Sequence, residues 1–87
     1  MTAAKQAYSH TEVLSLEVIR AFDAKVGRKG SYAKASRVVS GLLKAAAKRN
    51  EIGKRTSWGR VTGSSVFYEM TEEQVNSIRA QAIARAI

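Results

Sequence analysis

The chain has 87 residues, with neither cysteine nor proline, and its formal net charge is +8 at neutral pH. This length predicts one domain with a modest core, and the lack of cysteine excludes a disulfide framework, a thiolate metal site and a cysteine nucleophile. No apolar run approaches the roughly 20 residues of a membrane span, and the N-terminus lacks the apolar stretch of a signal peptide. We therefore expect a cytoplasmic protein with no membrane partner.

The positive charge is concentrated in one block, from Lys25 to Arg60. Eleven of the fifteen basic residues lie there with a single acid, Glu51, so the block carries a formal charge of +10. The rest of the chain has four basic and six acidic residues, a formal charge of −2. Clustered cations are typical of nucleic-acid binders, because a phosphate backbone that meets them releases its counterions. The alternative is a solvated basic surface.

The N-terminal part predicts a short irregular segment and then a helix. Residues 1–8 show no periodicity and are expected to fray. Ser9 to Glu12 match a capping box, and helical spacing joins the apolar residues Leu14, Val18, Ile19, Phe22 and Val26. The helix should end near Gly27, since residues 27–31 form a polar, glycine-bearing breaker.

The predicted loop after this helix is basic. Arg28, Lys29 and Lys34 lie in or beside it, next to Gly30 and Ser31. Its cations and backbone amides are candidates for phosphate binding, whereas Tyr32 is expected to pack.

A second helix, predicted from about Ala35 to Arg49, has two different sides. One side is apolar, through Val38, Val39, Leu42, Leu43 and Ala46. At 100° per residue, Arg37, Lys44 and Lys48 fall within about 40° of one another nearly opposite, and Ser40 and Gly41 share their side. Asn50 is predicted to follow the helix in the left-handed conformation.

A β-hairpin is predicted over residues 52–70, with its turn at residues 62–65. Turn-forming residues occupy that centre, and Val, Phe, Tyr and Trp are enriched on both sides of it. The first strand is basic, through Lys54, Arg55 and Arg60. In the second strand Tyr68 and Met70 are predicted to be core, and Trp58 in the first is expected in a core or an interface.

A closing helix is predicted over residues 71–87. Thr71 to Gln74 match a second capping box, and two glutamates in the first turn suit the positive end of the helix dipole. The apolar stripe of this helix is either core cover or a dimer seam, and it contains Val75, Ile78, Ala82, Ile83 and Ile87.

The order of these elements resembles a winged helix-turn-helix domain. The run from Val39 to Lys44, followed after six residues by Glu51 and Ile52, is similar to the recognition-helix signature of bacterial and archaeal winged-helix regulators. The run Val66–Thr71 is similar to their closing wing strand. The resemblance covers about residues 36–75.

The resemblance implies an α+β, mostly α fold, with a winged-helix domain over residues 9–70 and a C-terminal helix over residues 71–87. Regulators of this type are usually homodimers, which makes the C-terminal helix a candidate dimerisation element. A usual member also has a distinct short helix and a tight turn before the recognition helix. Here only residues 28–35 are available, so either a single turn around residues 32–34 forms that helix or the first helix takes its part.

These features predict a protein that binds double-stranded DNA, most simply a transcriptional regulator associated with the nucleoid. The helix of residues 36–49 would enter the major groove, and the wing of residues 52–70 would lie on the backbone or in a minor groove. Arg37 is the candidate for a guanine contact, and Gly41 for a close approach to the DNA. The candidate DNA-binding residues are Arg28, Lys29, Lys34, Arg37, Ser40, Gly41, Lys44, Lys48, Lys54, Arg55 and Arg60.

Other functions are also compatible with a small basic chain. One alternative is an RNA-binding or ribosome-associated winged-helix protein, and another is an architectural protein that coats DNA without sequence preference. An enzyme is not expected, because His10 is the only histidine, Asp23 the only aspartate, and no group has metal-ligand spacing. We expect no cofactor and no metal.

Overall fold

The computed structural model describes the backbone of residues 4–59 and 63–86 and the side chains of residues 4–56 and 65–86. In chain order its elements are β1 (Gln6–Ser9), α1 (His10–Val13), α2 (Leu16–Val26), α3 (Arg28–Lys48), β2 (Gly53–Gly59), β3 (Gly63–Met70) and α4 (Glu72–Arg85). The fold is therefore α+β and mostly helical, as the sequence predicted.

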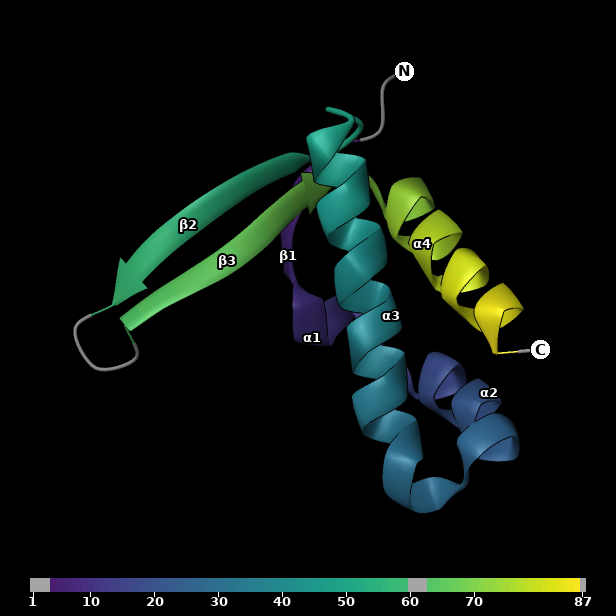
Figure 1. Cartoon of the computed structure of the whole chain (residues 1–87). Helices are drawn as coiled ribbons and strands as arrows, with labels where there is room; N and C mark the ends of the chain where they lie inside the picture. Colours follow the sequence, from purple (N-terminus) through teal and green to yellow (C-terminus); the bar gives the residue numbers. More distant parts are fainter. Residues whose placement is uncertain (1–3, 60–62, 87) are drawn as a thin grey trace.

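The strands form one antiparallel sheet in the order β1-β3-β2. β1 pairs only with the base of β3, from Gln6 opposite Met70 to Ser9 opposite Phe67, whereas β2 follows β3 along its length. The β2–β3 hairpin consequently extends beyond β1 and away from the helices (Figure 1). We expected residues 1–8 to lack regular structure, but residues 6–8 belong to β1. This strand is stabilised by backbone pairing with distant residues, which local periodicity cannot reveal.

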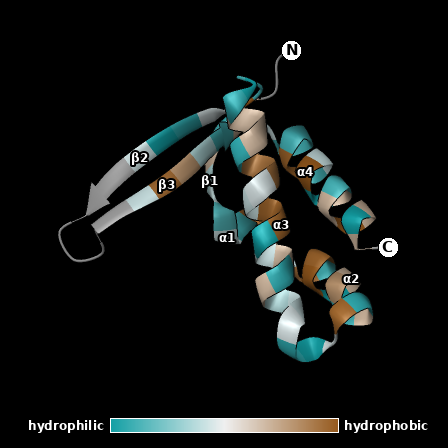
Figure 2. Cartoon of the chain, viewed as in Figure 1, coloured by the Kyte–Doolittle hydropathy of each residue, from teal (hydrophilic) through white to brown (hydrophobic). Residues whose placement is uncertain are grey.

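α3 is the central helix, and α2 and α4 both pack against it (Figure 1). The largest fully buried side chains are Phe22, Leu43, Met70, Val13, Val18, Val39 and Val75. Figure 2 shows apolar stretches on α2, α3 and α4, the three helices that pack together. Tyr68 and Met70, which the sequence predicted to be core, are buried.

The predicted first helix is divided in two. The capping box of Ser9 and Glu12 is present and opens α1. The chain then leaves the helical conformation at Leu14, and Ser15 caps α2 by accepting a hydrogen bond from the Val18 amide at 3.4 Å. The predicted stripe was wrong at its end, because the Val26 side chain is 43% exposed.

The predicted loop over residues 27–31 is absent, because α3 begins at Arg28, directly after Gly27. Gly27 has φ 81° and ψ 164°, a conformation that is essentially restricted to glycine, so one residue suffices to reverse the chain between α2 and α3. Gly30 and Ser31 lie inside α3, where the Ser31 hydroxyl donates to the Arg28 carbonyl at 3.2 Å. α2 is thus the helix that precedes α3, and residues 32–34 form no separate helix.

The C-terminal end of α3 closes as predicted. Asn50 has φ 61°, in the left-handed region. Its amide donates to the Ala47 carbonyl and the Glu51 amide donates to the Ala46 carbonyl, each at 3.0 Å. This pair of bonds satisfies carbonyls at the end of α3 and turns the chain into β2.

The hairpin and the closing helix differ from the prediction only in detail. β3 begins at Gly63, so residues 63–65, which we assigned to the turn, belong to a strand. The capping box of Thr71 and Gln74 is present and opens α4. Of the predicted stripe, Val75, Ile78 and Ala82 are buried in the core of this chain, and Ile87 lies outside the described residues. These three side chains pack in the core of the chain itself, so they are not free to form a dimer interface.

Across the ranges 4–59 and 63–86, no helix combines the length and the apolar character that a membrane crossing requires.

Candidate nucleic-acid interface

The side of α3 that faces away from the core lines an open groove of about 640 Å³. One lining residue, His10, comes from α1. The others belong to α3 and are Tyr32, Ala33, Ser36, Arg37, Ser40, Gly41 and Lys44. The opposite side of α3 is buried through Ala35, Val39, Leu42, Leu43 and Ala46. The predicted two-sided character of this helix is therefore confirmed.

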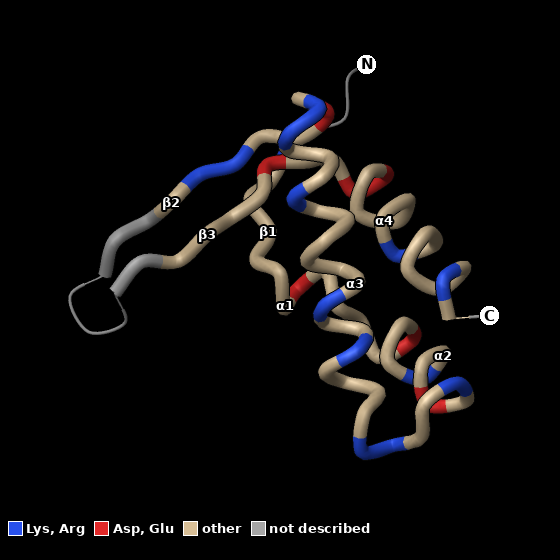
Figure 3. Tube along the Cα trace, viewed as in Figure 1, with Lys and Arg blue, Asp and Glu red and all other residues tan. Residues whose placement is uncertain are grey.

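A second depression, of about 260 Å³, lies where α3 meets β2. Its lining residues are Lys44, Ala47 and Lys48 from α3 and Lys54 from β2. We call it the lysine hollow. Lys44 lines both the groove and the lysine hollow, so the two form one continuous surface. Figure 3 shows cations along α3 and the first part of β2, while α2 carries charges of both signs.

His10 is a groove residue that sequence reasoning placed only near a helix cap. Its Nε2 lies 2.9 Å from the Ser36 carbonyl oxygen, to which it donates in the tautomer that carries the hydrogen on this nitrogen. The Ser36 hydroxyl lies 3.1 Å from the same nitrogen. These contacts join residues 26 positions apart and have no local sequence signal.

Arg79 of α4 holds the other end of α1 in place. Its Nε donates to the Val13 carbonyl at 2.9 Å, and a terminal nitrogen donates to the Glu12 carbonyl at 2.8 Å. A charged donor at the last carbonyls of a helix is favourable both as a hydrogen bond and toward the helix dipole. Arg79 thereby fixes the short helix from which His10 reaches the groove.

The floor and rim of the groove contain more than cations. Small residues line it at Ala33, Ser36, Ser40 and Gly41. Tyr32, which we expected to pack, is 54% exposed at its edge. Tyr32 is exposed because it lies on the groove side of α3, whereas the opposite side of the helix is the one that packs in the core. The groove therefore combines an aromatic ring, small residues and the cations Arg37 and Lys44.

Several predicted residues lie outside the groove and the lysine hollow. Arg28, Lys29 and Lys34 are exposed on the first two turns of α3, in a helix rather than in the predicted loop. Arg55 lies on the opposite face of the hairpin from Lys54, since neighbouring residues of a strand point to opposite faces. Arg60 and the side chain of Trp58 lie outside the described residues.

Two further cations of the basic block have partners within the chain. The Lys25 ammonium donates to the Arg85 carbonyl at 3.0 Å, which ties α2 to the end of α4. Arg49 forms an ion pair with Glu51, and in the described ranges no other ion pair occurs. The cations that line the groove and the lysine hollow are therefore not neutralised by the described carboxylates.

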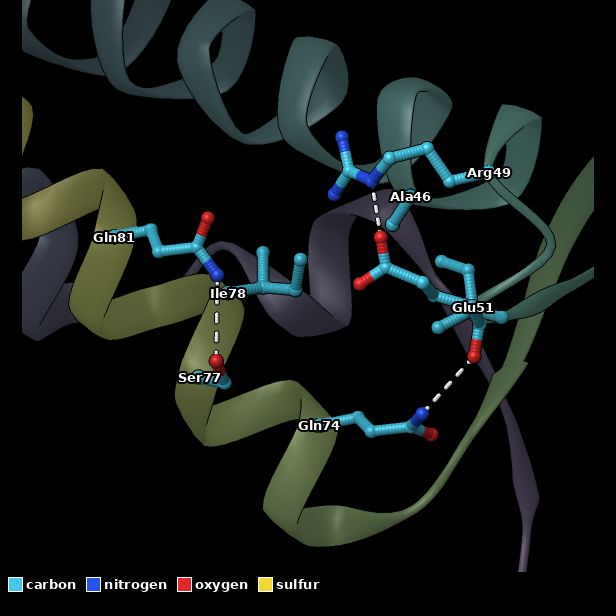
Figure 4. A pocket seen from close by; sticks show the side chains of 8 residues that line it. Ala46, Arg49, Glu51, Gln74, Ser77, Ile78 and Gln81 are labelled. Carbon is cyan, nitrogen blue, oxygen red and sulfur yellow. Dashed lines mark hydrogen bonds and ion pairs between the residues drawn. The ribbon is translucent and has the colours of Figure 1, made fainter.

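A small pocket of about 60 Å³ lies on the other side of the α3 terminus, beside α4 (Figure 4). Its polar groups bond to one another. The Gln74 amide donates to the Glu51 carbonyl at 3.0 Å, and the Gln81 amide donates to the Ser77 hydroxyl at 3.3 Å. This pocket joins α4 to the turn after α3 and carries no excess charge.

The remaining titratable chemistry is sparse. Burial raises the pKa of the Tyr68 phenol above its ordinary value of 10.0. Within the part of the chain that is described, no three His, Cys, Asp or Glu side chains are grouped so as to hold a metal ion.

Comparisons of the chain with protein-family models, with curated proteins and with solved structures gave no match.

Proposed function

We propose that this protein binds double-stranded DNA as a winged helix-turn-helix regulator, with α3 as its recognition helix. The observation that carries the proposal is the surface formed by the groove and the lysine hollow. Among the residues whose side chains are described, four cations line it, Arg37, Lys44, Lys48 and Lys54, and no acidic residue does. A duplex relieves the mutual repulsion of such cations and releases counterions as it binds.

The dimensions of α3 support an approach to the major groove. Its 21 residues give a helix about 31 Å long. The segment from Arg37 to Lys44 rises only about 10 Å, which fits a major groove about 12 Å wide. Ser40 and Gly41 lie between these two cations, where base edges would be met. Arg37 would then contact a guanine, worth about 1–3 kcal/mol of discrimination.

The arrangement of the hairpin supports the same docking. β2 and β3 follow α3 directly and extend from the side that carries the lysine hollow (Figures 1 and 3). A duplex along α3 would lie beside the base of this hairpin. We propose that the hairpin acts as the wing, with Lys54 facing the phosphate backbone.

The test is duplex binding by variants that each remove one cation. Arg37→Ala and Lys44→Ala should both weaken binding to a labelled duplex in fluorescence anisotropy, and Lys44→Ala should also lower the salt slope by about 1. Arg37→Ala should also reduce the preference for selected over scrambled sequence. Arg20→Ala is the matched control, because Arg20 is exposed on α2 and does not line the groove. If both groove variants bind the duplex like the wild type at equal salt, α3 is not the recognition helix.

The alternatives are tested in the same assay. A structured RNA that outcompetes duplex DNA at every salt concentration would favour an RNA-binding function. Equal affinity for selected and scrambled duplexes would favour an architectural protein. The homodimer that the resemblance implies stays a prediction, which sedimentation of the protein with and without duplex would decide.

A further inference from the structure

The lysine hollow is lined by three lysine side chains from two elements. Lys44 and Lys48 lie one helical turn apart on α3, and Lys54 approaches from β2. Ala47 is the remaining lining residue, and its methyl group leaves the space between the lysines open. All three lysine side chains are exposed, so their ammonium groups are accessible to a ligand.

The turn after α3 is what places Lys54 beside the other two lysines. The left-handed Asn50 and the two amide bonds that close α3 direct β2 back past the end of the helix. Lys54 lies opposite Tyr68 in the sheet register, and Tyr68 is buried against the helices. Lys54 therefore shares the helix-facing side of the hairpin, whereas Arg55 shares the other face with Phe67.

The charge in the hollow is unbalanced. No carboxylate lines it, and across residues 4–56 and 65–86 none of its lysines forms an ion pair. Three like charges around one small space repel one another. A tetrahedral anion with several acceptor oxygens relieves this repulsion and accepts a hydrogen bond from each ammonium.

We propose that the lysine hollow binds a single phosphate group of the duplex backbone, at the edge of the groove that α3 occupies. The site fixes the register of α3 on the DNA, because a phosphate held between helix and hairpin leaves the protein one position along the groove. The inference rests on the proposed function, since the phosphate is supplied by the duplex that α3 reads.

The experiment compares two adjacent cations of β2 that differ only in the face they occupy. Lys54→Ala should weaken duplex binding and lower the salt slope by about 1, whereas Arg55→Ala should leave both near the wild-type values. Both side chains are exposed, so neither substitution should destabilise the fold. Equal melting temperatures of the two variants and the wild type would confirm this. Equal losses in the two variants would overturn the proposal, because they would indicate a diffuse field rather than a site.

A double-mutant cycle tests whether one phosphate is shared. If Lys44 and Lys54 hold the same phosphate, the loss of affinity in the double alanine variant is smaller than the product of the two single losses. Losses that multiply independently would overturn the shared site. If Arg37→Ala weakens binding and Lys54→Ala does not, the lysine hollow is not a phosphate site, and the proposed function still holds. If Arg37→Ala, Lys44→Ala and Lys54→Ala all bind like the wild type, both the phosphate site and the proposed function are wrong.

A free phosphorylated anion could occupy the lysine hollow instead of a backbone phosphate, and competition experiments distinguish the two. Inorganic tripolyphosphate should compete with the duplex only weakly, because the duplex also contacts the groove. Tripolyphosphate that binds the wild type as tightly as the duplex, and loses that affinity in Lys54→Ala, would identify a small phosphorylated ligand instead and overturn the assignment to the backbone.

Discussion

Replacing Gly41 with alanine should stabilise the free protein and weaken its binding to DNA. Gly41 lies in the interior of α3 with ordinary helical φ, and a Cβ built there would meet nothing within 4 Å outside its own turn of helix. Alanine is favoured over glycine at such a position by about 1 kcal/mol. For a domain of this size that gain raises the melting temperature by about 4–8 °C.

The opposite effect is expected in the complex, because nothing in the fold requires a glycine on the groove side of α3. We infer that the missing side chain admits the DNA. A methyl group inserted into a close contact costs about 1–3 kcal/mol, which weakens binding about fivefold or more. Thermal unfolding followed by circular dichroism and duplex titration followed by anisotropy measure the two effects on the same preparation.

Gly30→Ala is the matched control. Gly30 also lies in α3, does not line the groove, and its Cβ would meet Val26 at an ordinary 3.7 Å. The Gly30→Ala substitution should therefore not weaken duplex binding. An unchanged affinity in Gly41→Ala would refute the close approach at Gly41, and a lower melting temperature would refute the open environment that the structure gives this residue.

Three further predictions concern the scaffold. Gly27→Ala should destabilise the protein by about 1–3 kcal/mol in urea unfolding, because its φ of 81° strains any side chain although the space around it is open; wild-type stability would contradict this. Arg79→Met should cost about 1.5–3 kcal/mol, since it removes the bonds to the α1 carbonyls, whereas Arg85→Met, on the same helix, should change little. Burial raises the Tyr68 pKa, so the fold favours the neutral phenol; this contribution is complete below pH 10.0 and is lost as pH rises through the raised pKa. Tyr68→Phe should therefore lose less stability than the wild type as the pH rises above 10.0, and equal losses in the two proteins would contradict a raised Tyr68 pKa.

Local sequence rules predicted the parts of the fold that depend on neighbouring residues. Both capping boxes are formed, since each joins residues three apart. Asn50 adopts the predicted left-handed conformation. The loop prediction over residues 27–31 was wrong for a physical reason: Gly30 lowers helix propensity by only about 1 kcal/mol, and the packing of α3 against α2 outweighs it.

The candidate interface shows the same division between local and long-range information. The sequence by itself determined that α3 has an apolar and a cationic side, because side-chain direction along a helix repeats every 3.6 residues. Strand alternation likewise separates Lys54 from Arg55. Only the tertiary structure decided which of these two side chains lies on the side of α3, because that depends on the path of the chain after Asn50.

The contacts between distant residues were also beyond sequence reasoning. The pairing of β1 with β3 and the approach of His10 to Ser36 each join segments far apart in the chain. Neither leaves a periodic signal, since the partners are chosen by how the whole chain packs. The sequence determined where the positive charge lies, and the tertiary structure decided which cations share one surface and which lysines face one another across the hollow.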